Sequence, residues 1–163
     1  MLDERIRVFY VDDNPRQSRM LTCLLEECGF RVIPVTNPAT ALPLCKQTSF
    51  DIALLDYDMP GITGSQLAEE IKFLLPDVPV VLISGYTALP ATDLIFADAH
   101  FGFGTALDDL LWTMRILVAP RVFVPEHRQV VEGREAHDHS YPCDDRGIPK
   151  HSRIMESRWS DST

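Results

Sequence analysis

The sequence lacks an apolar run of about 18 residues, the length that a membrane-spanning helix needs, and its N-terminus lacks the apolar core of a signal peptide. We therefore expect a cytoplasmic protein. Its four cysteines form no Cys-x-x-Cys pair, and Cys23, Cys28 and Cys45 lie in apolar, helix-like stretches. This placement favours buried free thiols over a disulfide framework or a zinc site. Basic residues are scarce, and a net charge of -9 disfavours nucleic acid and anionic membranes as partners.

Apolar residues are unevenly distributed along the 163-residue chain. They make up 62 of the first 119 residues but only 12 of the last 44. The first part has the size of one domain of about 100–150 residues, whereas the second is too polar to pack a core of its own. We expect a folded domain over residues 1–119 and a largely disordered tail over residues 120–163, with a short ordered stretch at residues 121–124.

Short apolar runs of strand length alternate with longer helical patterns in the first 119 residues. The strand candidates are residues 6–11, 31–35, 52–55, 78–83 and 99–103. The first, third and fourth of these are apolar on both faces, which is typical of central strands in a parallel sheet. The helix candidates are residues 15–28, 37–48, 65–75, 91–98 and 106–118. The candidate at residues 91–98 is short and weakly patterned, and Pro43 predicts a late start or a kink in the candidate that contains it.

This alternation predicts an α/β fold, with right-handed crossovers between the strands of an open parallel sheet. We expect the flavodoxin-like, doubly wound arrangement, in which five parallel strands take the order 2-1-3-4-5 and helices cover both faces. In such sheets the functional site lies beyond the carboxyl ends of the strands, where the strand order reverses.

Acidic and hydroxyl side chains follow three of the predicted strands. Asp12 and Asp13 come directly after the first strand, Asp56 ends the third, and Ser84 follows the fourth. Because the first and third strands are neighbours in this order, the three carboxylates should converge within a few ångströms. Carboxylates that close repel one another, and burial would raise their pKa values unless a cation compensates. Mg²⁺, which prefers oxygen ligands, is the natural compensator.

The stretches around these residues, VFYVDDNPR, DIALLDYDMPGITG and PVVLISGY, resemble the receiver domain of two-component response regulators. The resemblance covers about residues 5–118. It implies that Asp56 accepts a phosphoryl group from a histidine kinase or a histidine phosphotransferase and forms an acyl phosphate. The protein would be a stand-alone receiver that acts by contact with a downstream protein, because the tail is too short and polar for a DNA-binding domain. We expect it not to be an enzyme.

The resemblance also implies roles for the residues around Asp56. Asp12 and Asp13 would hold Mg²⁺ together with Asp56, and the backbone carbonyl of Asp58 would be a further ligand. The turn formed by Ser84 and Gly85 would bind the phosphoryl group, with the Ser84 hydroxyl donating to a phosphoryl oxygen.

The fifth strand departs from the receiver pattern. Receivers carry Lys-Pro just after this strand, and the alignment places Phe103 and Gly104 there instead. No lysine lies between residues 72 and 150, so a small shift in the alignment cannot restore it. At an effective dielectric near 20, losing one cation about 4 Å from a phosphoryl oxygen forfeits about 4 kcal/mol of Coulomb attraction. Arg16 is a possible substitute cation, and His100 stands at the position of the switch aromatic, where it could approach Ser84 or respond to pH.

Three alternatives remain open. Phe103 motivates a pseudo-receiver, an interaction module that keeps the fold but does not depend on phosphorylation. The Asp56-Tyr57-Asp58 sequence resembles the DxD motif of aspartyl-phosphate phosphatases, although that family places the motif after its first strand and needs a lysine. Asp12 and Asp13 could instead cap the helix that begins near Pro15, since aspartate is a favoured N-cap.

Overall fold

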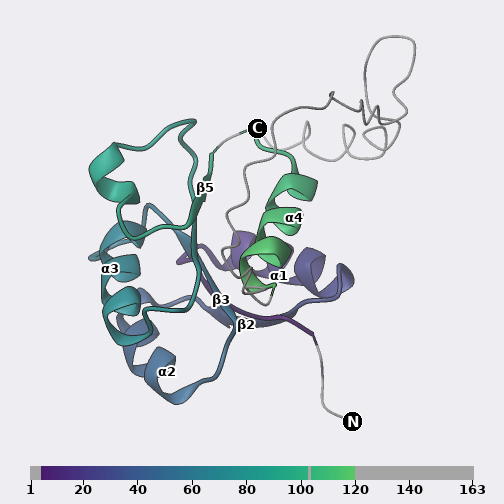
Figure 1. Cartoon of the computed structure of the whole chain (residues 1–163), viewed down its shortest axis with the longest axis horizontal. Coiled ribbons are helices and arrows are strands. Elements are labelled where there is room, and N and C mark those ends of the chain that lie inside the picture. Colours follow the sequence, from purple (N-terminus) through teal and green to yellow (C-terminus); the bar gives the residue numbers. More distant parts are fainter. Residues whose placement is uncertain (1–4, 103, 120–163) are drawn as a thin grey trace, which may run out of the picture. The chain divides into compact units, whose positions relative to one another are not determined.

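The computed structural model describes residues 5–102 and 104–119. All five strands of its sheet are parallel (Figure 1). The strands are β1 (Arg7–Val11), β2 (Arg31–Val35), β3 (Ile52–Asp56), β4 (Val80–Ile83) and β5 (Ala99–Phe101). Their order is β2-β1-β3-β4-β5, so the predicted fold class and strand order are confirmed. The order reverses between β1 and β3, which places the carboxyl ends of these two strands side by side.

Helices cover both faces of the sheet (Figure 1). The helices are α1 (Pro15–Glu27), α2 (Ala41–Gln47), α3 (Gly64–Leu74) and α4 (Leu107–Val118), with 3₁₀ turns η1 (Pro38–Thr40) and η2 (Ala91–Leu94). Phe9 and Val11 of β1 pack on the face covered by α2 and α3. Val8 and Tyr10 pack on the opposite face, which α1 and α4 cover. Burial on both faces explains why the strand was a nearly continuous apolar run.

Capping and proline positions explain where the helices begin. The Asn14 side chain accepts hydrogen bonds from the first turn of α1, and Pro15 is the first residue of that helix. Thr63 and Gln66 form a reciprocal capping box at the start of α3. The predicted late start around Pro43 is confirmed, because a 3₁₀ turn precedes α2 and Pro43 falls in the first turn of the helix. A missing N–H there removes no intrahelical hydrogen bond.

The predicted helix at residues 91–98 is wrong beyond its first turn, since only η2 forms. Asp98 gives the physical reason. Its backbone N–H donates to the Val80 carbonyl at 2.7 Å, and its carboxylate accepts the Val80 N–H at 2.7 Å. Lys72 also forms an ion pair with this carboxylate at 2.7 Å. These contacts hold residue 98 at the entrance of β4, so the chain turns into β5 and the helix does not continue.

The cysteine prediction is correct only in part. Cys45 is buried, Cys28 is partly buried, and both are free thiols. Cys23, however, is exposed. Two residues along a helix correspond to about 200° of rotation, so Cys23 lies nearly opposite the buried Leu25 on α1.

The expectations for residues 120–163 concern a part of the chain that the structure does not describe. The chain divides into units of residues 1–122 and 123–163. The predicted tail at residues 120–163, with its short ordered stretch at 121–124, is not described, and neither is Phe103. Across residues 5–102 and 104–119, none of the helices combines the length and the apolar character that crossing a bilayer requires.

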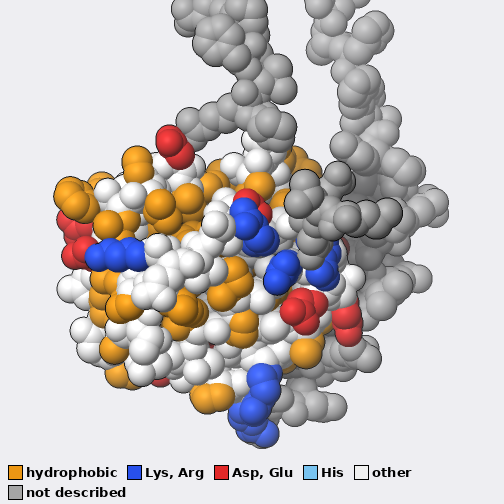
Figure 2. All heavy atoms as spheres, turned by 90° about the horizontal axis from the view of Figure 1, so that it is seen from below, with side chains coloured by type: hydrophobic (Ala, Val, Ile, Leu, Met, Phe, Trp, Pro, Cys, Tyr) orange, Lys and Arg blue, Asp and Glu red, His pale blue; other side chains and the backbone are white. Residues whose placement is uncertain are grey.

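Apolar and charged side chains are interspersed on the face of the molecule shown in Figure 2.

Candidate functional site

Three carboxylates meet at the adjacent carboxyl ends of β1 and β3. Val11, the last residue of β1, pairs with Leu55 of β3, so the residues that follow each of them are neighbours. One ligand atom from each of Asp12, Asp13 and Asp56 lies within 4.8 Å of the others. The predicted convergence of these three residues is therefore confirmed, and we call them the acidic cluster.

Asp12 is the most enclosed member of the acidic cluster, with only 2% of its surface exposed. One carboxylate oxygen accepts a hydrogen bond from the Tyr10 hydroxyl at 2.5 Å. The other accepts the backbone N–H of Asn14 at 2.8 Å. The alternative in which Asp12 and Asp13 cap the helix is wrong, because Asn14 is the N-cap of α1.

The carboxyl group of Asp56 is strongly perturbed by its surroundings. Burial raises the pKa of Asp56 to about 6, and the nearby charge of Asp12 adds to this effect. The nearby backbone amide of Tyr57 lowers the pKa, and the charges of Asp13 and Asp58 make smaller contributions that raise it. Burial, with a further contribution from repulsion within the cluster, therefore opposes ionisation of Asp56 in slightly acidic solution.

The donor set fits a hard divalent cation. Three carboxylate oxygens at this separation suit Mg²⁺, which is commonly held by one or two carboxylates with waters and phosphate oxygens completing its coordination. A divalent charge would also relieve the repulsion that raises the pKa of Asp56. Asp58, the expected source of a carbonyl ligand, is exposed in the turn after β3.

A close backbone contact fixes the turn that follows Asp56. The N–H of Gly64, the first residue of α3, donates to the Tyr57 carbonyl at 2.9 Å. A Cβ atom at position 64 would lie 2.4 Å from the Asp56 backbone oxygen, so a larger residue cannot approach as closely. Glycine at this position is what allows α3 to begin directly against the end of β3.

Ser84 is already joined to His100 across the end of β4 and β5. The Ser84 Oγ lies 3.1 Å from the Nε2 atom of His100, so the predicted approach of these two residues is present in the structure. The same hydroxyl donates to the Tyr86 carbonyl at 3.0 Å and accepts the Tyr86 N–H at 3.2 Å. Partial burial lowers the pKa of His100, which favours the neutral imidazole at pH 7. Gly85 lies inside this turn, with open space around its Cα.

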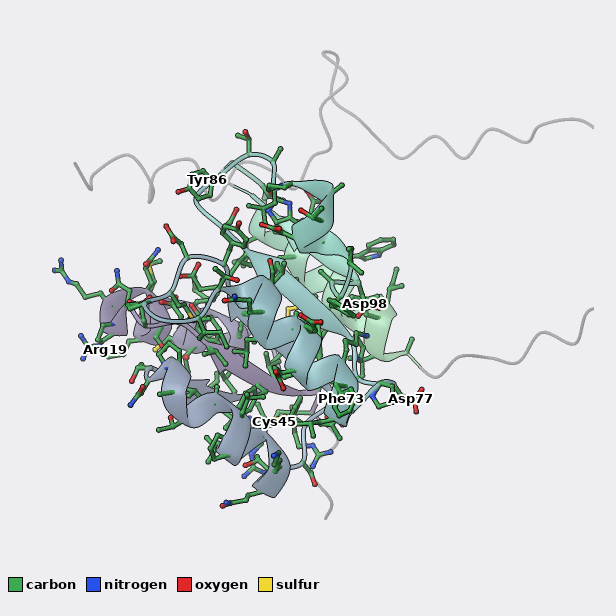
Figure 3. All side chains as sticks on the ribbon, turned by 90° about the vertical axis from the view of Figure 1, so that its left-hand side faces the viewer. Arg19, Cys45, Phe73, Asp77, Tyr86 and Asp98 are labelled. Atoms are coloured by element: carbon green, nitrogen blue, oxygen red, sulfur yellow. The ribbon has the colours of Figure 1, made fainter. Side chains whose placement is uncertain are left out.

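A tyrosine pair beside the site was not predicted from the sequence. The Tyr57 hydroxyl donates to Asp93 of η2 at 2.6 Å, and the rings of Tyr57 and Tyr86 meet edge to face with their centroids 6.2 Å apart. Figure 3 shows Tyr86 near one end of the molecule and Phe73 and Asp77 towards the opposite end. No sequence signal links position 57 with position 93, because the contact depends on where the chain places η2.

Arg16, which the sequence suggested as a substitute cation, is exposed in the first turn of α1. Phe103, which we aligned with the receiver lysine, lies outside the described residues. Both assignments stay predictions.

Comparison with known proteins identifies the family to which this domain belongs. The response regulator receiver domain family matches residues 8–100 of the chain. The chain is 39% identical over 66 residues to Sensor protein GacS of Pseudomonas syringae pv. syringae, a match covering 40% of the chain and 7% of GacS. It is 34% identical over 80 residues to Protein PilH of Pseudomonas aeruginosa, covering 48% of the chain and 66% of PilH. The matches thus span less than two thirds of either relative.

Solved structures agree with this result. Response regulator protein TrrA from Thermotoga maritima, in complex with Mg²⁺-BeF, is similar with a TM-score of 0.65 and 27% identity, covering 69% of this chain and 98% of TrrA. TrrA has also been solved in complex with the histidine kinase ThkA, and there it matches with a TM-score of 0.64, covering 69% of this chain and 97% of TrrA.

Proposed function

Since this chain belongs to the response regulator receiver domain family, we propose that it works in phosphorelay signalling by accepting a phosphoryl group on Asp56. It is a receiver of the kind that is phosphorylated and is not an enzyme, which sets aside the phosphatase alternative. The observation that carries the proposal is the acidic cluster, in which Asp12, Asp13 and Asp56 bring their oxygens within 4.8 Å at the reversal of the sheet.

In the proposed reaction Asp56 is the nucleophile. A carboxylate oxygen of Asp56 bonds to phosphorus as the P–N bond to a phosphohistidine donor breaks, and the electron pair returns to the imidazole nitrogen. The product is an acyl phosphate on Asp56. Although its pKa is raised to about 6, Asp56 is mostly ionised at pH 7, as this attack requires. The contact of Gly64 with the backbone of Asp56 helps to hold the attacking group in position.

Asp12, Asp13 and the backbone carbonyl of Asp58 would hold Mg²⁺ beside Asp56. When bound, Mg²⁺ neutralises charge on the transferring phosphoryl group. Ser84 would donate its hydroxyl to a phosphoryl oxygen, which requires it to release the Tyr86 carbonyl that it contacts at 3.0 Å. His100 is hydrogen-bonded to the same Ser84 oxygen, so a change at Ser84 would reach it directly, and we propose it as the switch residue.

The proposed phosphoryl donor is a histidine kinase or a histidine phosphotransferase, which the receiver would meet in the cytoplasm. Support comes from TrrA, a similar protein that has been solved in complex with the histidine kinase ThkA. We propose that the output is a contact with a downstream protein, made by a receiver that stands alone.

The proposal is tested by incubating the protein with acetyl phosphate and Mg²⁺ and locating the modification by mass spectrometry. We expect one phosphoryl group on Asp56 and none on an Asp56→Asn variant. Asp51→Asn is the matched control, since Asp51 lies at the other end of β3 and pairs with Arg7. Absence of an adduct with either acetyl phosphate or beryllofluoride would contradict the proposal.

The second candidate, a pseudo-receiver that signals without phosphorylation, is favoured by the phenylalanine at position 103. It predicts that Asp56→Asn leaves signalling in cells unchanged. Loss of signalling with normal folding of that variant would exclude the pseudo-receiver and support the phosphorelay function.

A further inference from the structure

A tyrosine hydroxyl is buried next to the acidic cluster. Tyr10 is the last residue but one of β1 and is 1% exposed, with its ring in the apolar cluster under α1 and α4. Its hydroxyl donates to Asp12 at 2.5 Å. A buried hydroxyl needs a hydrogen-bond partner, and a bond to an ionised carboxylate is stronger than a bond between neutral groups. The acceptor of Tyr10 is thus a proposed metal ligand.

Asp12 is held from two directions at once. The Tyr10 hydroxyl bonds one oxygen, and the Asn14 backbone N–H bonds the other at 2.8 Å. Each carboxylate oxygen can accept two hydrogen bonds or ligand contacts, so one acceptor position on each oxygen remains. With both oxygens tethered, the carboxylate cannot rotate freely, and its orientation toward Asp13 and Asp56 is set by the protein.

A basic side chain does not provide this restraint. In the described part of the chain, Lys72 pairs with Asp98 and Arg7 pairs with Asp51, and no ion pair involves Asp12. The hydroxyl of Tyr10 is the side-chain donor to Asp12 in the described residues. A neutral donor can hold a carboxylate without adding a positive charge that would compete with a metal ion.

We propose that Tyr10 is a positioning residue for the metal site, whose hydroxyl orients the Asp12 carboxylate and thereby increases the affinity of the acidic cluster for Mg²⁺. This inference rests on the proposed function, because it takes Asp12 to be a metal ligand. Removing a group that orients a metal ligand lowers metal affinity about 10- to 100-fold. Tyr10 would act through Asp12 and would not contact the ion.

The test is a Mg²⁺ titration of the full chain, followed by the amide NMR signals of Asp13 and Asp56. We expect Tyr10→Phe, which removes only the hydroxyl, to bind Mg²⁺ about 10- to 100-fold more weakly than the unmodified protein. Tyr57→Phe is the matched control, since it removes a tyrosine–aspartate hydrogen bond of 2.6 Å whose acceptor, Asp93, is not in the acidic cluster. The control should bind Mg²⁺ within about threefold of the unmodified protein.

The outcomes separate this inference from the function on which it rests. If the unmodified protein binds Mg²⁺ and Tyr10→Phe binds within threefold of it, the positioning role is wrong while the receiver function stands. Equal weakening in both variants would also overturn the role of Tyr10, because general loosening would explain it. No binding by the unmodified protein would overturn both.

A second measurement covers the case in which Tyr10→Phe does not fold. The unmodified protein, labelled with ¹³C at tyrosine Cζ, gives a Tyr10 signal that reports the hydrogen bond of its hydroxyl. We expect this signal to shift during the Mg²⁺ titration with the same midpoint as the Asp13 amide, while the Tyr57 signal moves less. A Tyr10 signal that stays fixed while Asp13 responds would overturn the inference.

Discussion

The three carboxylates of the acidic cluster differ in how the protein accommodates their charge. Asp12 has a donor on each oxygen, from Tyr10 and from the backbone of Asn14. The backbone amide of Tyr57 lowers the pKa of Asp56, but burial and the charge of Asp12 outweigh this effect and raise the pKa to about 6. Without a cation, ionisation of Asp56 therefore has a free-energy cost.

This cost predicts a dependence of stability on pH that can be assigned to one residue. The folded-state pKa of Asp56, about 6, lies above its ordinary value of 3.8. Its contribution to stability is therefore complete below about pH 3.8 and is lost as the pH rises through 6. At pH 7 without Mg²⁺, we expect Asp56→Asn to raise the free energy of unfolding by about 1–2 kcal/mol, allowing for screening by solvent.

Urea unfolding at several pH values in the presence of a chelator checks this expectation. The difference between the two proteins should shrink toward pH 4, where Asp56 is protonated. A difference that is the same at pH 4 and pH 7 would show that the substitution acts through packing and not through charge.

Among the elements, α4 contacts the C-terminal end of α1 through one arginine. Arg115 of α4 donates to the Cys28 carbonyl at the C-cap of α1, at 2.7 Å. Its guanidinium group also lies over the Phe30 ring, 4.9 Å from the centroid. The two contacts satisfy a free carbonyl at the end of α1 and hold two helices that share one face of the sheet.

We expect Arg115→Ala to lower the free energy of unfolding by about 0.5–1.5 kcal/mol, because both contacts are lost. Arg115→Lys should restore little, since an ammonium group cannot reproduce the planar contact with the ring. Arg19→Ala is the control, because Arg19 is exposed on α1 (Figure 3) and takes part in neither of these contacts, and it should change stability by less than about 0.5 kcal/mol. Chemical denaturation measures all three variants, and an equal loss in the control would contradict the tether.

At the scale of the whole domain, Asp51, just before β3, and Asp56, at its end, make stability depend on pH in opposite directions. Hydrogen bonds from Arg7 lower the pKa of Asp51, so its stabilising effect is present above the ordinary pKa and is lost as the pH falls. Asp56 loses its contribution as the pH rises. The contribution of Asp56 therefore changes between about pH 3.8 and 6, whereas that of the Arg7–Asp51 pair, joined at 2.9 Å, changes below about pH 3.8.

Mg²⁺ should stabilise the folded domain only where the cluster is ionised. A ligand that binds only the folded state at about 100 times its Kd contributes about 2.7 kcal/mol. We expect added Mg²⁺ to raise the Tm at about pH 7.5 and to have little effect at about pH 4.5, with NaCl at equal ionic strength as the control. Asp56→Asn should reduce the response to Mg²⁺, and an equal rise in Tm at both pH values would contradict binding at the cluster.

The fold class and the meeting of Asp12, Asp13 and Asp56 could both be predicted from the sequence. Both follow from patterns that are local in the chain, namely apolar runs of strand length and the residues that end them. Because parallel strands have their carboxyl ends on one edge, knowing the strand order was enough to bring β1 and β3 together.

How these side chains are held could not be predicted without the packed structure. Side-chain direction and contacts between distant segments determine the bond from Tyr10 to Asp12 and the one between Ser84 and His100. They also determine that the connection from β4 to β5 forms only the short turn η2. A strand pattern indicates that Tyr10 is buried, but it does not indicate what its hydroxyl meets. Hydrogen bonds are directional and short in range, whereas apolar burial is not, so periodicity predicts the fold and leaves the partners to the packed structure.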